Sequence, residues 1–243
     1  MMLSSIVSAT IVRLGVRSIF GRWRGVLLLV LPVVLIGISV LVRVLVGEDA
    51  DAAEGTLYGL GLVVIVPLVA LLAMSGLLAP EIDDGSISYL LAKPISRHTI
   101  VASKLVVAVA CVLVFGALPM LAAGLVLRSG SPSFALGFAL AALVGGTASC
   151  AIFALLSVMT RHAVVIGLIY LLVWEGLLGG LLDGVRWLSL TRWSAELIDQ
   201  IADLELVDNL PLAYAVIAFV AVLGGGTWLT GWQLRSFNLT GDE

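Results

Sequence analysis

Long uncharged apolar runs alternate with short polar segments along most of the chain. A bilayer core of roughly 30 Å requires about 20 helical residues, and six of the runs meet that requirement. The pattern therefore predicts six transmembrane helices, at about residues 26–46, 57–79, 102–127, 134–159, 163–182 and 211–234. Three of these runs contain a proline within the span, Pro32, Pro67 and Pro119, which predicts kinks because proline removes a backbone donor.

The composition indicates a membrane protein rather than a soluble enzyme. Of the 243 residues, 61% are hydrophobic and 12% are charged, about half the charged fraction of a soluble domain. We expect an all-α polytopic membrane protein in two parts, an N-terminal segment at residues 1–25 and a six-span domain at residues 26–243. The net charge of −3 gives no electrostatic basis for binding nucleic acid.

The N-terminal segment has the pattern of an amphipathic helix. Such a helix would lie along the cytoplasmic membrane surface with a tryptophan at headgroup level. The alternative is a positively charged flank of the first span. The basic face carries Arg13, Arg17 and Arg24, the apolar face carries Leu3, Val7, Ile11 and Leu14, and Trp23 ends the helix.

The distribution of lysine and arginine predicts that both termini lie in the cytoplasm. With that orientation, nine basic residues lie inside and four outside, as expected for a protein of the cytoplasmic membrane. The inner set is Arg13, Arg17, Arg22, Arg24, Lys93, Arg97, Lys104, Arg161 and Arg235, and the outer set is Arg43, Arg128, Arg186 and Arg192.

The predicted outer loop at residues 183–210 contains a helical pattern. Ser194 could cap a helix whose apolar face carries Leu197, Ile198, Ile201 and Leu204 and whose polar face carries Glu196, Asp199, Gln200 and Asp203. We expect this helix to lie at the extracellular membrane surface. Trp187 and Trp193 would hold it at the interface.

Small residues recur at four-residue spacing in two spans. The first set is Gly137, Ala141, Gly145 and Ser149, and the second is Gly176 and Gly180. Such spacing lets two helix backbones approach closely, although glycine is also simply common in membrane helices.

Catalytic and metal-binding motifs are missing from the sequence. No G-x-x-x-x-G-K-[ST] stretch is present, so we expect no ATP bound by this chain, and no H-E-x-x-H pattern includes His98 or His162. Cys111 and Cys150 lie in apolar runs and read as buried small side chains. We therefore expect a non-catalytic protein without a metal or cofactor of its own.

Glu175 is the one acidic residue well inside a predicted span. A charge at that depth is costly, which makes the residue a candidate functional site. It could contact a substrate in the transport path, relay a proton, or pair structurally with another helix.

The polar segment at residues 80–104 separates the second and third spans. Gly85 and Pro94 bracket a short helix whose Ile87, Leu90 and Leu91 share one face. The segment resembles the signature E-x-x-x-G-[ST]-x-x-x-L-L-x-x-P-[IV]-S-R, followed by a lysine, of permease subunits in the type-2 family of ABC exporters. The matching residues are Glu81, Gly85, Ser86, Leu90, Leu91, Pro94, Ile95, Ser96, Arg97 and Lys104.

This resemblance implies a permease that pairs with a second permease, identical or homologous, and with two ATPase subunits that bind ATP and Mg²⁺. The stretch after Glu81 would be the coupling helix that docks on the ATPase. Its apolar contacts would be Leu90 and Leu91. Its other contacts would come from Asp83, Asp84, Gly85, Ser86, Tyr89, Lys93, Pro94, Ser96 and Arg97. We further hypothesise that Glu81 pairs with Arg13 or Arg17 of the N-terminal helix.

Two other functions remain open from the residues alone. One is a membrane scaffold that assembles a cytoplasmic complex, and the other is a proton-coupled secondary transporter that uses Glu175. A capped cytoplasmic helix favours the exporter, because an ion-driven carrier does not need one.

Overall fold

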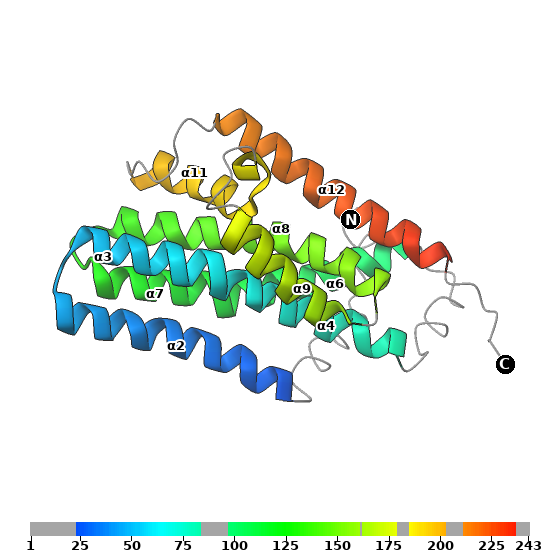
Figure 1. Cartoon of the computed structure of the whole chain (residues 1–243), viewed down its shortest axis with the longest axis horizontal. Coiled ribbons are helices and arrows are strands. Elements are labelled where there is room, and N and C mark those ends of the chain that lie inside the picture. The colour runs from blue at the N-terminus through cyan, green and yellow to red at the C-terminus, as the bar shows by residue number, and fades with distance from the viewer. Residues whose placement is uncertain (1–22, 84–96, 161, 179–184, 203–210, 237–243) are drawn as a thin grey trace, which may run out of the picture.

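The computed structural model describes residues 23–83, 97–160, 162–178, 185–202 and 211–236. Every regular element in these ranges is helical, which confirms the predicted all-α polytopic architecture (Figure 1). The elements are α2 (Trp23–Val46), α3 (Ala50–Gly55), η2 (Thr56–Ile65), α4 (Val66–Asp83), α6 (Arg97–Val112), η3 (Leu113–Ala117), α7 (Leu118–Leu127), α8 (Pro132–Met159), α9 (Ala163–Ile169), η4 (Tyr170–Leu178), η5 (Val185–Leu188), α11 (Leu190–Ala202) and α12 (Leu212–Ser236).

Five apolar helices in the described ranges are long enough to cross a membrane. They are Gly25–Val46, Ala50–Leu78, His98–Leu127, Pro132–Met159 and Leu212–Leu234, and each overlaps a predicted span. The remaining predicted span, residues 163–182, begins as the shorter apolar helix Ala163–Leu177. Its last residues, 179–182, lie outside the described residues.

Helix α8 lies at the centre of the bundle and packs against α4, α6, α7, α11 and α12 (Figure 1). Its buried face alternates aromatic residues with small ones. Phe134, Phe138 and Phe153 are almost completely buried, as are Ala141 and Ala142. Small residues at these positions let neighbouring helices pack closely. In a bilayer this packing is important, because no hydrophobic force drives the helices together.

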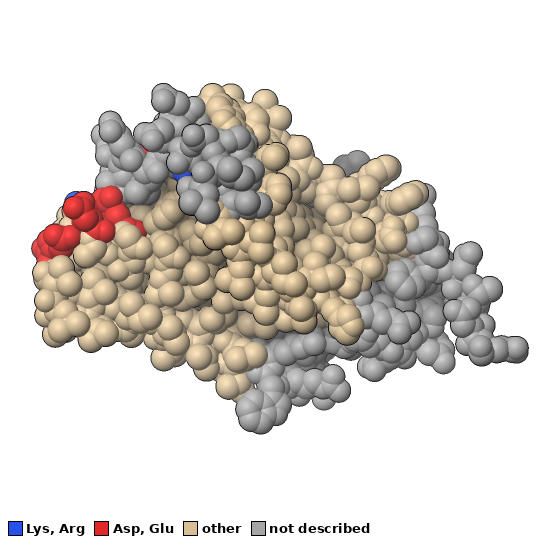
Figure 2. Space-filling view, viewed as in Figure 1, with Lys and Arg blue, Asp and Glu red and all other residues tan. Residues whose placement is uncertain are grey.

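Acidic side chains mark one end of the bundle. We call the end that carries the turns at residues 47–49 and 128–131 the acidic end, and the end where α4 stops and α6 begins the motif end. Acidic side chains from residues 48–54 gather at the acidic end (Figure 2). There Asp49 caps α3 by accepting a 2.8 Å hydrogen bond from the Ala52 amide.

Two of the three span prolines follow π-helical turns. Before Pro67, the Val66 amide donates to the Gly61 carbonyl, five residues back; before Pro119, the Leu118 amide donates to the Leu113 carbonyl in the same way. A proline ring clashes with the carbonyl four residues earlier and has no amide to donate, so the preceding turn widens. Pro32 lies inside the α-helix α2 without such a turn.

The predicted cap of the helix at residues 190–202 was wrong. Helix α11 begins at Leu190, and the Ser194 hydroxyl donates within the helix to the Leu190 carbonyl at 2.9 Å. Apolar residues recur from Leu190 onward, so the helical period starts one turn earlier than Ser194 suggested. Leu204 and Asp203 lie outside the described residues.

The position of this helix relative to the membrane surface stays a prediction. Within the bundle, Trp193 is buried, and Ala195, Glu196 and Ile198 are buried too. The reason is that α11 packs against α8 and α12. Trp187 is the exposed member of the tryptophan pair.

The first glycine ladder makes a close helix contact at Gly145. A β-carbon placed there would lie within 3.2 Å of the Ser194 side chain of α11. In the second ladder, a β-carbon placed at Gly176 would meet, among the described residues, the Leu171 carbonyl of its own element at an ordinary 3.6 Å. Gly180 lies outside the described residues.

Candidate functional site at Glu175

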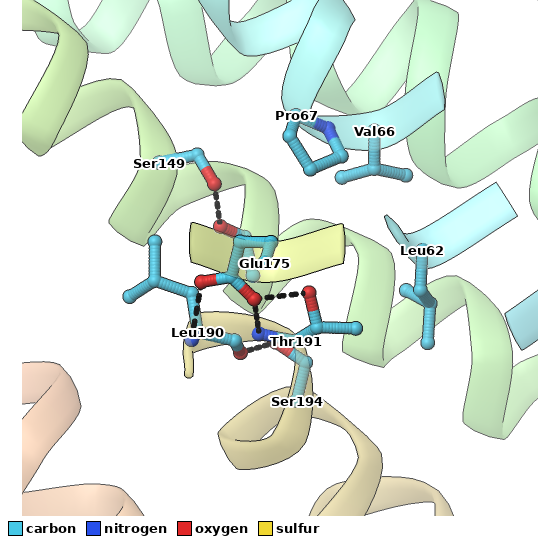
Figure 3. Close-up of a pocket in the computed structure, with 9 residues that line it drawn as sticks. Leu62, Val66, Pro67, Ser149, Glu175, Leu190, Thr191 and Ser194 are labelled. Atoms are coloured by element: carbon cyan, nitrogen blue, oxygen red, sulfur yellow. Dashed lines mark hydrogen bonds between the residues drawn. The ribbon is translucent and has the colours of Figure 1, made fainter. Parts of the chain in front are cut away.

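Glu175 lies in η4, and its side chain is only 6% exposed. The carboxylate points toward the first residues of α11 (Figure 3). Its Oε1 atom accepts a hydrogen bond from the Leu190 amide at 2.9 Å, and its Oε2 atom accepts from the Ser189 hydroxyl at 2.7 Å. Thr191 donates to Oε2 twice, from its hydroxyl at 2.8 Å and from its amide at 3.3 Å.

These donors place a carboxylate at the N-terminus of a helix. The first amides of a helix have no partner within the helix, and the helix dipole favours negative charge at that end. A side chain next to the helix usually supplies the cap. Here Glu175, from a different helical element, supplies it to α11, so the buried charge is stabilised by the helix that it caps.

Two aromatic residues of η4, Tyr170 and Trp174, lie near Glu175. The Tyr170 hydroxyl lies 3.5 Å from Oε1 of Glu175, and the Tyr170 ring meets Phe153 of α8 edge-on, with centroids 6.2 Å apart. The Trp174 ring stacks over Tyr170 at 6.4 Å. Bulky rings therefore fix the stretch of η4 that carries Glu175 against α8.

The space beside Glu175 is small. The hollow is lined by residues of η2, α4, α8, η4 and α11, and its volume is about 10 Å³, roughly what one water molecule requires. Ser149, the last residue of the first ladder, lines it but donates to the Gly145 carbonyl of its own helix. In this arrangement the hollow has no room for a transported molecule.

Of the three roles open to Glu175, this geometry matches structural pairing with another helix. All its short hydrogen bonds come from donors at Ser189, Leu190 and Thr191. These partners were not predicted, because Ser194 rather than Leu190 was expected at the start of the helix. An apolar period read from Leu190, with Ser189 before it, would have indicated the correct helix start.

Further contacts hold α11 next to the start of α12. The Trp193 indole donates to the Trp187 carbonyl at 2.8 Å, and the Tyr214 hydroxyl donates to the same carbonyl at 2.9 Å. The Trp187 and Tyr214 rings pack edge-on with centroids 5.2 Å apart. Trp193 also belongs to a buried cluster with Ala148, Leu190 and Ala215.

Three of the predicted coupling residues fall in the described ranges, and they lie at the motif end. Glu81 and Asp83 belong to the last turn of α4, and Arg97 is the first residue of α6. The other coupling residues fall in residues 84–96, outside the described residues: Asp84, Gly85, Ser86, Tyr89, Leu90, Leu91, Lys93, Pro94 and Ser96. Arg13 and Arg17 are also outside them, so the hypothesis that Glu81 pairs with either arginine stays a prediction.

The described bundle is that of a multi-pass, all-helical membrane protein. Residues 6–230 match the family model described as ABC-2 family transporter protein. The chain therefore belongs to the ABC-2 transporter family, as the motif at residues 81–104 indicated, and it is a membrane component of a transporter. No curated protein matches the chain.

Proposed function

We propose that this chain is the permease subunit of an ATP-driven exporter in the cytoplasmic membrane. ATP hydrolysis would take place on a separate ATPase subunit, which binds the ATP and Mg²⁺. The family match over residues 6–230 is the observation that carries this proposal, because it covers almost the whole helical bundle. The signature residues from Glu81 to Lys104 lie within that match and agree with it.

The position of the signature suits mechanical coupling. Residues 84–96 connect two long helices, α4 and α6, at one end of the bundle. A displacement of that segment would be passed to both helices, and both pack against the central α8. Coupling of this kind requires stiff elements attached directly to the membrane helices.

The complete transporter would contain two permeases and two ATPases. The second permease could be identical or homologous. The motif end would face the cytoplasm together with both termini, and the acidic end would face outward. This orientation agrees with the excess of lysine and arginine in the predicted cytoplasmic segments.

A copurification experiment tests the proposal. The full chain is tagged, purified in mild detergent and analysed for a bound ATPase by mass spectrometry and ATP hydrolysis. The variant Leu90→Ala/Leu91→Ala should lose most of the bound ATPase, because it removes the apolar contacts of the coupling helix. The matched control is Leu41→Ala/Leu45→Ala, two exposed leucines of α2, which should retain it.

Three outcomes would overturn the proposal or change it. A chain that binds no ATPase in its wild-type form is not a permease of this type. A chain that binds an ATPase equally well with both leucines removed docks through another surface. Binding without any effect of the chain on ATP hydrolysis would favour the membrane scaffold instead.

A further inference from the structure

A buried lysine joins α6 to α4 near the motif end. Lys104 of α6 is 1% exposed, and its Nζ atom donates a hydrogen bond to the Leu77 carbonyl of α4 at 2.5 Å. Leu77 is itself 1% exposed. The bond therefore lies between the two helices and not on the bundle surface.

Burying the charged side chain of Lys104 at this position costs free energy. It lies in the apolar helix His98–Leu127, and its acceptor is one residue from the end of the apolar helix Ala50–Leu78. An ammonium group taken out of water must be compensated, and an apolar residue of similar size would cost less in such surroundings. The neighbouring Ser103 hydroxyl donates within α6 to the Thr99 carbonyl, whereas the Lys104 bond crosses to another helix.

The bond between Lys104 and the Leu77 carbonyl lies close to both ends of residues 84–96. Leu77 lies six residues before the end of α4 at Asp83, and Lys104 lies seven residues after the start of α6 at Arg97. At 1.5 Å per residue, the bond is about 10 Å from the point where each helix meets that segment. It is a polar link between α4 and α6, the two helices that residues 84–96 connect.

Apolar contacts alone would fix these two helices poorly relative to each other. In a bilayer, lipid tails compete with leucine side chains, so apolar helix faces can slide at little cost. A charge-assisted hydrogen bond has a defined length and direction. It therefore fixes the relative height of α4 and α6 at one place.

We propose that Lys104 is a positioning residue of the ATP-driven cycle, which makes α4 and α6 move as one body when the ATPase displaces residues 84–96. The inference rests on the proposed function. It assigns to the last residue of the signature a mechanical role in the membrane, distinct from the contacts of the coupling helix with the ATPase.

Hydrogen exchange of the assembled complex in nanodiscs tests the inference. The complex contains the full chain and the ATPase that copurifies with it, and it is compared without nucleotide and after trapping with ATP, Mg²⁺ and vanadate. Mass spectrometry follows two backbone segments, residues 70–83 of α4 and residues 97–110 of α6. Lys104→Met removes the charge at similar length, and Lys104→Arg retains it.

In the wild-type complex and in Lys104→Arg, trapping should change exchange in both segments together. In Lys104→Met, the α6 segment should still respond, while the α4 segment should exchange about tenfold faster and lose its response to trapping. A merely structural lysine would accelerate exchange equally in both states and leave the two responses parallel. That parallel behaviour would overturn the inference.

The control removes another cation that binds a helix carbonyl at the opposite end. Arg43 donates to the Leu127 carbonyl at 3.1 Å, and Arg43→Met should leave the response of both motif-end segments unchanged. If Lys104→Met does not assemble, Lys104→Gln takes its place, because it retains an N–H donor without charge. It should show an intermediate loss of the α4 response, and a full wild-type response would overturn the inference.

Failure of the inference can be distinguished from failure of the proposed function. If no ATPase binds, or if trapping changes exchange in neither segment of the wild-type complex, the proposed coupling itself is wrong. If both segments respond in the wild type and respond in parallel in Lys104→Met, only the role of Lys104 is wrong.

Discussion

The Leu190 amide donates to the Glu175 carboxylate at 2.9 Å, so a residue of η4 caps α11, which begins fifteen residues later. Ser189 and Thr191 complete the same contact. A buried acid in a membrane helix is often a sign of transport chemistry. In this protein, its contacts are those of a cap on the N-terminus of α11.

Removing the carboxylate should therefore destabilise the whole bundle. In Glu175→Ala, the amides of Leu190 and Thr191 would lose their acceptor in a buried site. We expect a loss of about 3 kcal/mol in the free energy of unfolding, because buried donors without partners are costly. Glu175→Gln should lose less, since its amide oxygen can still accept. Unfolding in a detergent titration with SDS measures both.

The control for this prediction is Asp51→Asn, which changes an exposed acid of α3 and should shift stability by less than about 0.5 kcal/mol. A Glu175→Ala variant as stable as Asp51→Asn would contradict the capping role. If transport is lost at full stability, the substrate or proton role would regain support.

The approach of α11 to α8 depends on the absence of a side chain at Gly145. A β-carbon there would lie 3.2 Å from the β-carbon of Ser194 and closer still to its hydroxyl. Gly145→Ala should lower the free energy of unfolding by about 1–3 kcal/mol, as overpacked helix contacts do. Ser194→Ala in the same chain should recover part of that loss, because it removes the hydroxyl.

Gly224→Ala is the matched control for Gly145→Ala, since a β-carbon placed there would meet no described residue outside its own stretch of α12 within 4 Å. This substitution should be neutral or slightly stabilising, because alanine has a higher helix propensity than glycine. Equal effects at positions 145 and 224 would show that helix propensity, and not the contact with Ser194, determines the outcome.

The sequence predicted the membrane helices well for a physical reason. Length and apolarity suffice to identify a span, because every backbone polar group in the bilayer must be satisfied within the helix. The five long helices therefore overlap the predicted spans, although the second begins at Ala50 rather than near residue 57. For the same reason, the family signature could be placed between two spans before any contact was known.

Contacts between distant residues could not be predicted in this way. Nothing in the pattern around Glu175 indicates that Ser189 and Thr191 would surround its carboxylate, because local periodicity carries no information on tertiary partners. Trp193 was expected at a membrane interface from its residue type, and its burial against α8 and α12 could not be read from the sequence. Lys104 could be matched to the signature, yet its bond to the Leu77 carbonyl follows only from the packing of α6 on α4.

A second glycine contact should be less tolerant than Gly145. A β-carbon at Gly124 of α7 would lie 2.8 Å from the Ala135 α-carbon of α8. Backbone atoms cannot move aside as a serine side chain can, so Gly124→Ala must separate the two helices. We expect it to cost more than Gly145→Ala, about 3 kcal/mol or more, in the same SDS titration.

No single partner substitution should rescue Gly124→Ala, because Ala135→Gly removes the β-carbon but leaves the α-carbon in place. Recovery of wild-type stability in the double variant would show that the side chain of Ala135, and not its backbone, limits the approach.

The ion pair between Arg43 and Glu48 at the acidic end should contribute little. The two side chains are 31% and 51% exposed, so water and salt screen their attraction. Arg43 also donates to the Leu127 carbonyl, and the Ser129 hydroxyl donates to Glu48 at 2.7 Å. A double-mutant cycle of Arg43→Met and Glu48→Gln should therefore give a coupling energy of about 0.2–1 kcal/mol, and less at high salt. Arg43→Met alone should cost more than Glu48→Gln, because it also leaves the Leu127 carbonyl without this donor. A coupling energy above about 2 kcal/mol that salt does not change would contradict this prediction, and would indicate that a second permease covers the acidic end and removes the pair from water.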